Sequence, residues 1–370
     1  MHLETILRKA HELDASDVHL VAGHKPMLRI HTVMHPLDHE VLTPEAMERA
    51  LESLISPSQL ETFTENNDLD FSHEIEGFGR YRANAHRQRQ GVGIAMRLVR
   101  TKIPPMSELT LPEVISRLTY LPRGLVLVTG DTGSGKSTTL AAMIQTMNER
   151  YRKHIITLED PVEYVFKSDQ CLIEQRELGA DMPTFASGLK HALRQDPDII
   201  LVGETRDKET ADNAIQASLT GHLVFSTLHT NDAPSTILRM VDLGVETFLI
   251  TATVEAIVAQ RLVRRICDKC KVEYEPSEAE LMELELRPSD VSGRTFFRGD
   301  GCDNCNGTGY KGRLALFEMM VLDDALRELV INQTSTAGLR AECRRRGMRT
   351  LRETGLLSIY DGRTTIDEVV

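Results

Sequence analysis

The spacing of hydrophobic and polar positions predicts a small α+β domain over the first hundred residues. Apolar side chains recur at helical spacing over residues 2–13, and a second helix is expected from a capping threonine, Thr43, to about Ile55. Alternating or short apolar runs bounded by turn residues predict strands at 18–21, 28–33, 81–86 and 92–99. We assign residues 1–102 to this domain, and the prolines within residues 103–112 mark a linker.

After residue 124 the pattern changes to short, wholly apolar runs separated by stretches of helical spacing. These runs occupy residues 125–129, 155–158, 199–202 and 223–226. Apolar runs that alternate with helices are typical of a parallel sheet whose two faces are both covered. We therefore expect an α/β core over residues 113–265, a cysteine-bearing module over 266–315 and a helical C-terminal region over 316–370.

Composition and charge exclude several classes of protein. The chain has 370 residues, with 43 lysines and arginines against 55 aspartates and glutamates, so its net charge is −12. An acidic chain is a poor non-specific binder of nucleic acid, because phosphate binding depends on cationic charge. A run of about 18 apolar residues and the pattern of an export signal are both missing, so we expect no membrane-spanning helix. The six cysteines therefore read as thiols or metal ligands.

Residues 130–137 read Gly-Asp-Thr-Gly-Ser-Gly-Lys-Ser, which matches the phosphate-loop pattern G-x-x-x-x-G-K-S/T between an expected strand and an expected helix. The glycines let successive backbone N–H groups face an anion, Lys136 supplies charge for the β and γ phosphates, and the Ser137 hydroxyl can bind Mg²⁺. We therefore predict that the loop binds ATP and magnesium; the alternative is a glycine-rich turn that matches by chance. The expected nucleotide-binding residues are Gly130, Asp131, Thr132, Gly133, Ser134, Gly135, Lys136, Ser137 and Thr138.

Acidic and histidine side chains follow neighbouring strands of the expected sheet. Glu159 follows one apolar run, and Glu204 follows another after Gly203, which stands where a Walker-B strand usually carries aspartate. Because ligands of an open parallel sheet gather beyond the carboxyl ends of its strands, both acids should project towards the phosphates. His222 and His229 flank a third run and are candidates to sense the γ-phosphate. The alternatives are helix caps or solvated turns for the acids and ordinary structural roles for the histidines.

Arginines concentrate in the expected strands at the end of the first domain, where Arg82 and Arg97 lie in adjacent strands. Arginine holds phosphate oxygens bidentately and keeps its charge. An arginine supplied from another domain can offset the charge that develops during phosphoryl transfer. We therefore predict an anion-binding face here, with a solvated strand face as the alternative.

Two cysteine pairs, Cys267 with Cys270 and Cys302 with Cys305, form the pattern C-x-x-C…C-x-x-C. Two intervening residues let both thiolates of a pair bind one ion from a tight turn, and four thiolates complete a tetrahedral zinc site with no open position for catalysis. We predict a structural zinc ion and, because the pairs lie far apart in the sequence, a flexible intervening loop. Two reduced, metal-free pairs are the alternative.

These motifs resemble those of one family, the hexameric ATPases that power type II secretion and type IV pili. The resemblance rests on SDVHL at 16–20, the phosphate loop, ITLEDPVEY at 156–164, RQDPDIILVGETRD at 194–207 and TGHLVFSTLHTNDA at 220–233. It implies an α/β fold with a RecA-like P-loop ATPase domain, preceded by a small PAS-like α+β domain and carrying a zinc-knuckle insertion.

Carried over by position, the resemblance also implies roles for individual side chains. The residues concerned are Glu159, Glu204, His222, His229, Arg82, Arg97 and Arg206. The first glutamate would polarise the attacking water, the second would position Mg²⁺, and both histidines would lie near the γ-phosphate. Two of the arginines match the family's paired first-domain arginines, and the third matches a phosphate-facing position. Lys190 stands where some members carry arginine, so we assign it no role.

The same resemblance implies a cytoplasmic homohexamer, peripheral at the inner membrane, that hydrolyses ATP and passes motion through a platform protein to pilin-like subunits. Membrane contact would be through partners only, and no nucleic-acid partner is expected. Residues 77–104 look most like retraction ATPases of type IV pili, whereas the cysteine pairs and residues 361–366 look like extension and secretion ATPases. We favour extension or secretion, because the zinc module is a discrete insertion. Retraction, a nucleic-acid or conjugation-type translocating ATPase, and a non-enzymatic zinc-knuckle binding module are the alternatives.

Overall fold

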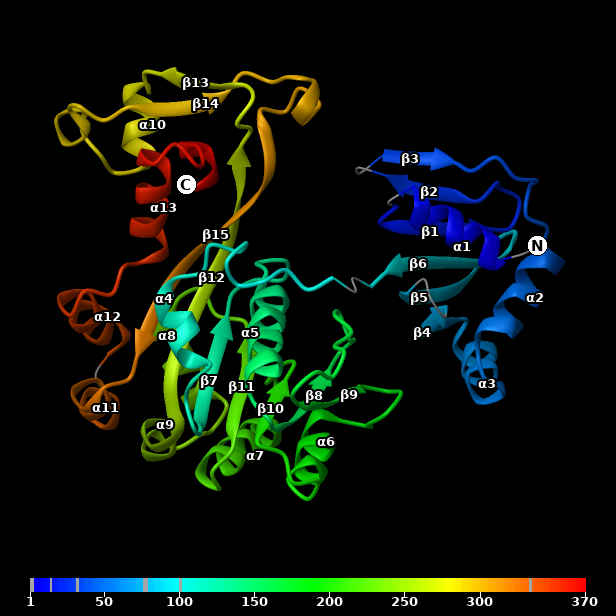
Figure 1. The fold of residues 1–370 in the computed structure, drawn as a ribbon, viewed down its shortest axis with the longest axis horizontal. Helices are drawn as coiled ribbons and strands as arrows, with labels where there is room; N and C mark the ends of the chain where they lie inside the picture. The colour runs from blue at the N-terminus through cyan, green and yellow to red at the C-terminus, as the bar shows by residue number, and fades with distance from the viewer. Residues whose placement is uncertain (1–2, 14, 31–32, 76–78, 100–101, 333–334) are drawn as a thin grey trace. The chain divides into compact units, whose positions relative to one another are not determined.

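The computed structural model describes residues 3–13, 15–30, 33–75, 79–99, 102–332 and 335–370. Contacts divide the chain into two compact units (Figure 1). The first unit consists of Met1–Ile103 and the short segment Pro161–Phe166, and the second of Pro104–Asp160 and Lys167–Val370. The division after Ile103 falls at the start of the proline-rich stretch, and the finer domain boundaries remain predictions.

The described part of the first unit contains an antiparallel sheet with strand order β3-β2-β1-β6-β5-β4. Its elements are α1 (Leu3–Glu12), β1 (Asp17–Val21), β2 (Met27–Ile30), β3 (Val33–Pro36), α2 (Pro44–Leu54), α3 (Pro57–Asn66), β4 (Asp68–Ile75), β5 (Gly79–Gln88) and β6 (Gly91–Leu98). α1 and α2 confirm the two helices predicted from hydrophobic spacing. His2 of the first predicted helix, residues 31–32 of one predicted strand, and residues 77–78 and 100–101 of the retraction-like stretch 77–104 lie outside the described residues.

The sequence pattern missed α3 because Pro57 reads as a stop signal for the preceding helix. In the structure Pro57 is also the first residue of α3, a position that proline favours because its missing N–H would be unpaired there anyway. Ser56 caps this helix by accepting a hydrogen bond from the Gln59 N–H. One proline therefore separates two helices that the pattern reduced to one.

The two faces of the first unit's sheet have different surroundings. Hydrophobic side chains of the helices, including Leu7 and Leu51, pack against strand residues such as Leu20 and Tyr81 on one face. Side chains alternate along a strand, so the residues that follow these core positions point to the opposite face. The core of this unit therefore lies between the helices and one face of the sheet, and the other face is available for polar side chains.

The described part of the second unit contains a sheet with strand order β15-β12-β7-β11-β10-β8-β9. These strands are β7 (Gly124–Thr129), β8 (His154–Glu159), β9 (Leu172–Glu177), β10 (Ile199–Val202), β11 (Leu223–Leu228), β12 (Val254–Ile266) and β15 (Tyr310–Val321). All neighbours run parallel except β12 and β15, which are antiparallel. The four predicted apolar runs are the central strands β7, β11, β10 and β8, which confirms the α/β fold class.

Helices precede, connect or follow these strands, and several of them pack on the sheet (Figure 1). They are α4 (Glu113–Leu118), α5 (Lys136–Arg150), α6 (Phe185–Ala192), α7 (Lys208–Leu219), α8 (Ala233–Asp242), α9 (Thr247–Thr253), α11 (Asp324–Ile331), α12 (Thr336–Arg345) and α13 (Leu351–Tyr360). The buried core joins strand residues such as Ile156 and Ile200 to Leu189 of α6 and Ile215 of α7. Because the central strands are parallel, their carboxyl ends meet at one edge of the sheet.

The segment between the cysteine pairs is built from regular elements. It contains β13 (Lys271–Tyr274), α10 (Glu278–Glu283), the 3-10 helix η1 (Pro288–Val291) and β14 (Phe296–Gly299). Leu281 and Phe296 of this segment pack with Ile359 and Ile366 from the end of the chain, where α13 and the 3-10 helix η3 (Ile366–Glu368) lie. The expectation of a flexible loop is therefore wrong, because the segment shares a small hydrophobic core with the C-terminal region. β15 runs through the boundary predicted at residue 315.

Candidate active site and metal centre

The phosphate loop lies between β7 and α5, as its sequence motif requires. Gly133 and Gly135 have φ values of 82° and 91°, in the left-handed region that glycine adopts without strain. Gly135 immediately precedes α5, whose unpaired N-terminal N–H groups favour an anion. The Lys136 ammonium donates to the carbonyl oxygens of Gly130 at 2.7 Å and Asp131 at 3.0 Å, so it folds back onto the loop. The remaining predicted loop residues, in the same turn or at the start of α5, are Thr132, Ser134, Ser137 and Thr138.

The Glu204 carboxylate is the centre of a charged cluster just beyond β10. It lies 2.6 Å from Nη2 of Arg206 and 3.2 Å from Nε2 of His229. Burial opposes the ionisation of Glu204, but Arg206, His229 and Lys136 together lower its pKa below the ordinary value. The influence of Lys136 places this acid close to the phosphate loop. An ionised carboxylate in this position is a suitable oxygen ligand for Mg²⁺.

Glu159 ends β8, the strand beside β10, and its Oε1 atom accepts a hydrogen bond from the Thr157 hydroxyl at 2.6 Å. Backbone atoms of β8 come very near Gly203, where a Cβ atom would lie 3.0 Å from the Leu158 oxygen and 3.2 Å from the Glu159 Cα. A side chain would therefore press on the neighbouring backbone. This close approach favours glycine at residue 203, and the acidic side chain comes one residue later, at Glu204.

The two predicted histidines lie at opposite edges of the sheet. His229 follows β11 at the edge that carries the phosphate loop and contacts Glu204. His222 precedes β11; its carbonyl accepts from the Gly124 N–H, and its Nδ1 lies 2.9 Å from the Ala217 oxygen at the end of α7. A strand of 6 residues separates them, which is roughly 20 Å at about 3.3 Å per residue. The expectation that both histidines lie near one γ-phosphate is thus corrected, because His222 is on the far edge.

Two further cations near these motifs differ in their surroundings. Arg206 contacts Glu204, yet 63% of its side chain is exposed, so the guanidinium keeps donors for another ligand. Lys190 lies in the last turn of α6 with an exposed side chain. Arg206 therefore belongs to the Glu204 cluster, whereas Lys190 is a surface residue.

In the first unit, Arg82 and Arg97 are cross-strand neighbours on the sheet face away from the helices. Nε of Arg97 donates to Oδ1 of Asp17 at 2.8 Å, while 70% of the Arg97 side chain is exposed. Burial opposes the ionisation of Asp17, but hydrogen bonds from Ser16 and Arg97 lower its pKa. Asp17 therefore holds the inner nitrogen of Arg97 and leaves its outer nitrogens facing solvent, a suitable arrangement for contact with an anion.

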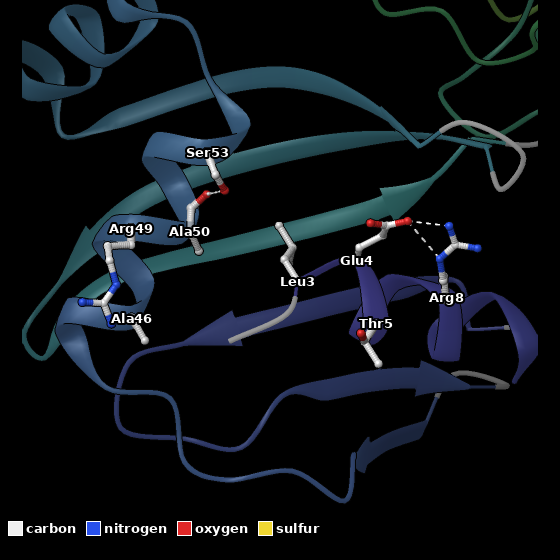
Figure 2. A pocket seen from close by; sticks show the side chains of 8 residues that line it. All are labelled: Leu3, Glu4, Thr5, Arg8, Ala46, Arg49, Ala50 and Ser53. Carbon is white, nitrogen blue, oxygen red and sulfur yellow. Dashed lines mark hydrogen bonds and ion pairs between the residues drawn. The ribbon is translucent and has the colours of Figure 1, made fainter.

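A pocket of about 510 Å³ lies between α1 and α2 (Figure 2). The residues that line it are Leu3, Glu4, Thr5, Arg8, Ala46, Arg49, Ala50 and Ser53. Glu4 and Arg8 form an ion pair along one wall. Because α1 and α2 cover the core face of the sheet, this pocket lies on the other side of the sheet from Arg82 and Arg97, and it contains none of the predicted motifs.

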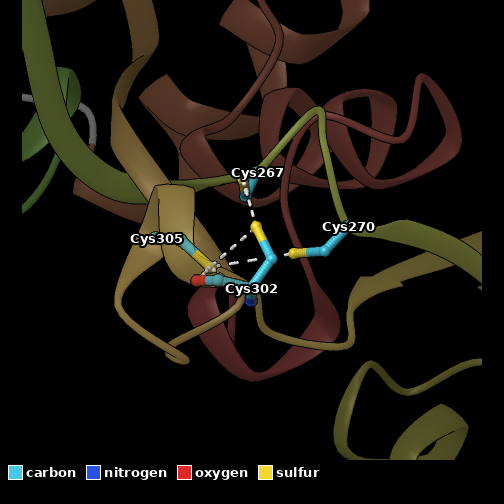
Figure 3. Close-up of side chains that lie close together, drawn as sticks. All are labelled: Cys267, Cys270, Cys302 and Cys305. Atoms are coloured by element: carbon cyan, nitrogen blue, oxygen red, sulfur yellow. Dashed lines mark hydrogen bonds between the residues drawn. The ribbon is translucent and has the colours of Figure 1, made fainter.

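The four predicted cysteines come together at one point (Figure 3). Their sulfur atoms all lie within 4.8 Å of one another. The distance is 3.9 Å between Cys267 and Cys302, 3.7 Å between Cys270 and Cys305, and 3.8 Å between Cys302 and Cys305. Tetrahedral Zn–S bonds of about 2.3 Å place sulfur atoms roughly 3.8 Å apart, so the donor set fits a zinc ion.

Backbone N–H groups favour the thiolate form of Cys305, whereas burial raises the pKa of the Cys270 thiol to about 12. Burial alone would raise the pKa of the Cys305 thiol, but the N–H groups of Cys302 and Gly309 donate to its sulfur and help lower the pKa to about 6. The Asn304 amide donates to the sulfur of Cys267 at 3.3 Å. Thiolates are the form of cysteine that binds metal, so the local hydrogen bonds agree with a candidate structural metal centre.

Two residues of these sites were missed by sequence reasoning. Asp17 belongs to the SDVHL motif, yet only the fold brings it beside Arg97. Gln260 in β12 contacts the phosphate loop, and the sequence signal for it is weak, because it follows the apolar residues 256–259 but is followed at once by Arg261. Only the fold shows that its amide is buried against specific partners.

Comparisons with known proteins agree with this geometry. The sequence model of the family described as type II/IV secretion system protein matches residues 86–370. The type IV pilus assembly ATPase PilB of Myxococcus xanthus is 47% identical over 250 residues, which cover 67% of this chain and 44% of PilB. The type II secretion system protein HxcR of Pseudomonas aeruginosa is 39% identical over 384 residues, covering 100% of this chain and 76% of HxcR. The chain therefore belongs to the type II/IV secretion system protein family.

The crystal structure of the pilus retraction motor PilT with bound ADP shares the fold, with a TM-score of 0.83 and 35% identity over 100% of this chain and 96% of that one. The chain spans less than half the length of several curated relatives, including PilB. Across the described ranges, no helix is both long and apolar enough to cross a membrane. The family resemblance and the fold class predicted from the motifs are thus confirmed.

Proposed function

We propose that the chain is an ATP-hydrolysing motor that drives the assembly of pilin-like subunits. The observation that carries this proposal is the grouping, at one edge of the second unit's sheet, of the phosphate loop with Glu159 and the Glu204–His229 pair. A phosphate loop binds nucleotide, and hydrolysis also needs a metal ligand and a group that orients water. The cluster supplies candidates for each of these requirements.

The proposed division of labour follows the position of each side chain. Lys136 holds the β and γ phosphates, and Ser137 with Glu204 binds Mg²⁺. Glu159 orients the attacking water, and His229 lies where it can respond to the γ-phosphate through its contact with Glu204. The guanidinium groups of Arg82, Arg97 and Arg206 offset phosphate charge.

Removal of the loop lysine tests this assignment. Lys136→Ala should lower the ATP turnover rate by about a hundredfold or more, because the charge that stabilises the transferred phosphate is lost. The matched control is Lys167→Ala, which removes an exposed lysine of the same unit and should leave turnover unchanged. A folded Lys136→Ala protein that hydrolyses ATP at the wild-type rate would falsify the proposal.

For the direction of transport, we propose type IV pilus extension or type II secretion, by a cytoplasmic homohexamer docked on a platform protein of the inner membrane. The four-cysteine cluster supports this choice, because the sequence resemblance associates it with extension and secretion ATPases. The similarity to PilB and HxcR agrees with it. Retraction is the second candidate, favoured by the match of PilT to the whole chain.

A further inference from the structure

β12 carries one buried amide near its centre, directly after the buried apolar residues 256–259. Gln260 is only 2% exposed, and its neighbour Ala259 is fully buried. An amide is unfavourable inside a protein unless its donor and acceptor atoms find partners. The contacts of Gln260 therefore show which part of the molecule this residue serves.

Both ends of the Gln260 amide bind the phosphate loop or the helix that follows it. Nε2 of Gln260 donates to the Ser134 carbonyl oxygen at 2.9 Å. Oε1 accepts from the hydroxyl of Thr139, a buried residue in the first turn of α5, at 2.8 Å. One side chain thus connects the phosphate loop to α5, the helix that begins where the loop ends.

Two glycines of the loop lie against the same residue. A Cβ atom on Gly130 would come within 2.3 Å of the Gln260 backbone oxygen, and one on Gly135 within 2.8 Å of Gln260 Nε2. The neighbouring Arg261 contacts the Asp131 carboxylate. β12 therefore packs closely against the phosphate loop. Side chains at residues 130 and 135 would collide with Gln260, which is one reason why both positions are glycine.

The bond to Ser134 fixes the direction of a peptide group. A peptide is planar and trans, so the carbonyl of Ser134 and the N–H of Gly135 point in opposite directions. Because Gln260 draws the carbonyl towards β12, the Gly135 N–H points away from β12. A loop that binds phosphate needs its N–H groups to converge on the anion, and a reversed peptide would present an oxygen instead.

We propose that Gln260 is a positioning residue that keeps the phosphate loop in its nucleotide-binding conformation. It acts through the Ser134–Gly135 peptide and does not itself touch the nucleotide. This inference rests on the proposed function, since it concerns the same site. On this proposal, β12 contributes to nucleotide affinity in addition to the residues of the loop motif.

Three variants test the proposal by the binding of a fluorescent ADP analogue and by steady-state ATP hydrolysis. Gln260→Glu removes the donor to Ser134 and should weaken ADP binding and raise KM for ATP about tenfold at pH 8, with a smaller change in kcat. Gln260→Met keeps the side-chain volume without polar atoms and should show a similar loss. Thr139→Val removes only the second contact and should change affinity about threefold or less.

The pH dependence separates positioning from general damage. At pH 6 the buried carboxyl group that the Gln260→Glu variant carries should be protonated, and its O–H can again donate to the Ser134 oxygen, so nucleotide affinity should recover relative to wild type. The methionine variant should not recover. Lys136, Asp131 and Arg261 are the charged groups at the loop, and measuring wild type at each pH corrects for their effects.

Circular dichroism and metal content first establish that each variant is folded. Wild-type affinity in Gln260→Met overturns the positioning role, even if Gln260→Glu does not fold. Loss of affinity in Gln260→Glu without recovery at pH 6, in a protein that remains folded, also overturns it. If wild type binds no nucleotide at all, the proposed function fails instead.

Discussion

Two acids in this chain, Asp17 and Glu204, keep their negative charge by contact with an arginine although both are largely buried. In each case the arginine remains mostly exposed, so it is oriented without being removed from solvent. A buried carboxylate thus fixes the direction of a cation that keeps donors for an anion. These are effects of single side chains, and they are testable by single substitutions.

Substitution of Asp17 should reduce the contribution of Arg97 to ATP hydrolysis. Asp17→Asn should lower ATP turnover roughly tenfold, because the charged bond that orients the guanidinium is lost and small misplacements are costly in catalysis. Arg97→Ala should cause a loss at least as large, and the double variant should lose no more than Arg97→Ala alone, since both residues act through one contact. Fully additive losses in steady-state assays would contradict this coupling.

The same pair gives a prediction for stability against pH. The folded-state pKa of Asp17 lies below the ordinary value of 3.8, so its contribution to stability is present above that value and is lost as pH falls through the folded-state pKa. Urea unfolding should show wild type more stable than Asp17→Asn at pH 6, with a difference that shrinks below about pH 4. If the stability difference between wild type and Asp17→Asn does not change with pH, the charge of Asp17 does not cause it.

Sequence patterns placed a residue well where its position depends on the local chain, and poorly where it depends on the fold. The position of Glu204 beyond β10 was predictable because an acid at the end of an apolar strand has a known place in a parallel sheet. Asp17 was given no role, because its partner Arg97 is brought to it only by strand pairing. His222 was misplaced because a short motif does not show that its two histidines are separated by a full strand.

At the scale of elements, the cysteine module combines a candidate metal site with hydrophobic contacts to the C-terminal region. The two cysteine pairs hold the ends of a segment whose interior packs on Ile359 and Ile366. Because ligand thiolates are brought together only in the folded chain, the free energy of metal binding also stabilises the fold.

Loss of one ligand should therefore release zinc and lower thermal stability. Metal analysis of the purified wild type should give about one zinc per chain, and Cys302→Ser should bind little and unfold at a lower temperature. The control is Cys171→Ser, which alters a buried cysteine outside the cluster and should retain the metal. If the wild-type protein contains no zinc, the four cysteines do not form a zinc site.

Elements with strong periodicity or wholly apolar runs were predictable, and elements defined by tertiary contacts were not. The central strands of the second unit were found from their apolar runs. The segment between the cysteine pairs was expected to be flexible because the two pairs lie far apart in the sequence. Its order comes from a small core shared with Ile359 and Ile366, which lie far away in the sequence.

At the scale of the whole molecule, fold and motifs define a motor family but leave the direction of transport to experiment. Complementation of pilus mutants tests it directly. If the proposed direction is right, the gene should restore surface pili in an extension-deficient strain and should not restore retraction in a retraction-deficient strain. A Lys136→Ala version should restore neither. Rescue of retraction alone would favour the second candidate.

The length of β12 has a mechanical consequence. This strand rests against the phosphate loop at Gln260 and ends immediately before Cys267, about 23 Å further on at about 3.3 Å per residue. Over that distance it is paired with β15, with one register irregularity between Arg264 and Ile266. A tilt of about five degrees at Gln260 would move the cysteine end by about 2 Å. A change in the direction of β12 at the phosphate loop would therefore be felt at the cysteine cluster, because one continuous strand connects the two.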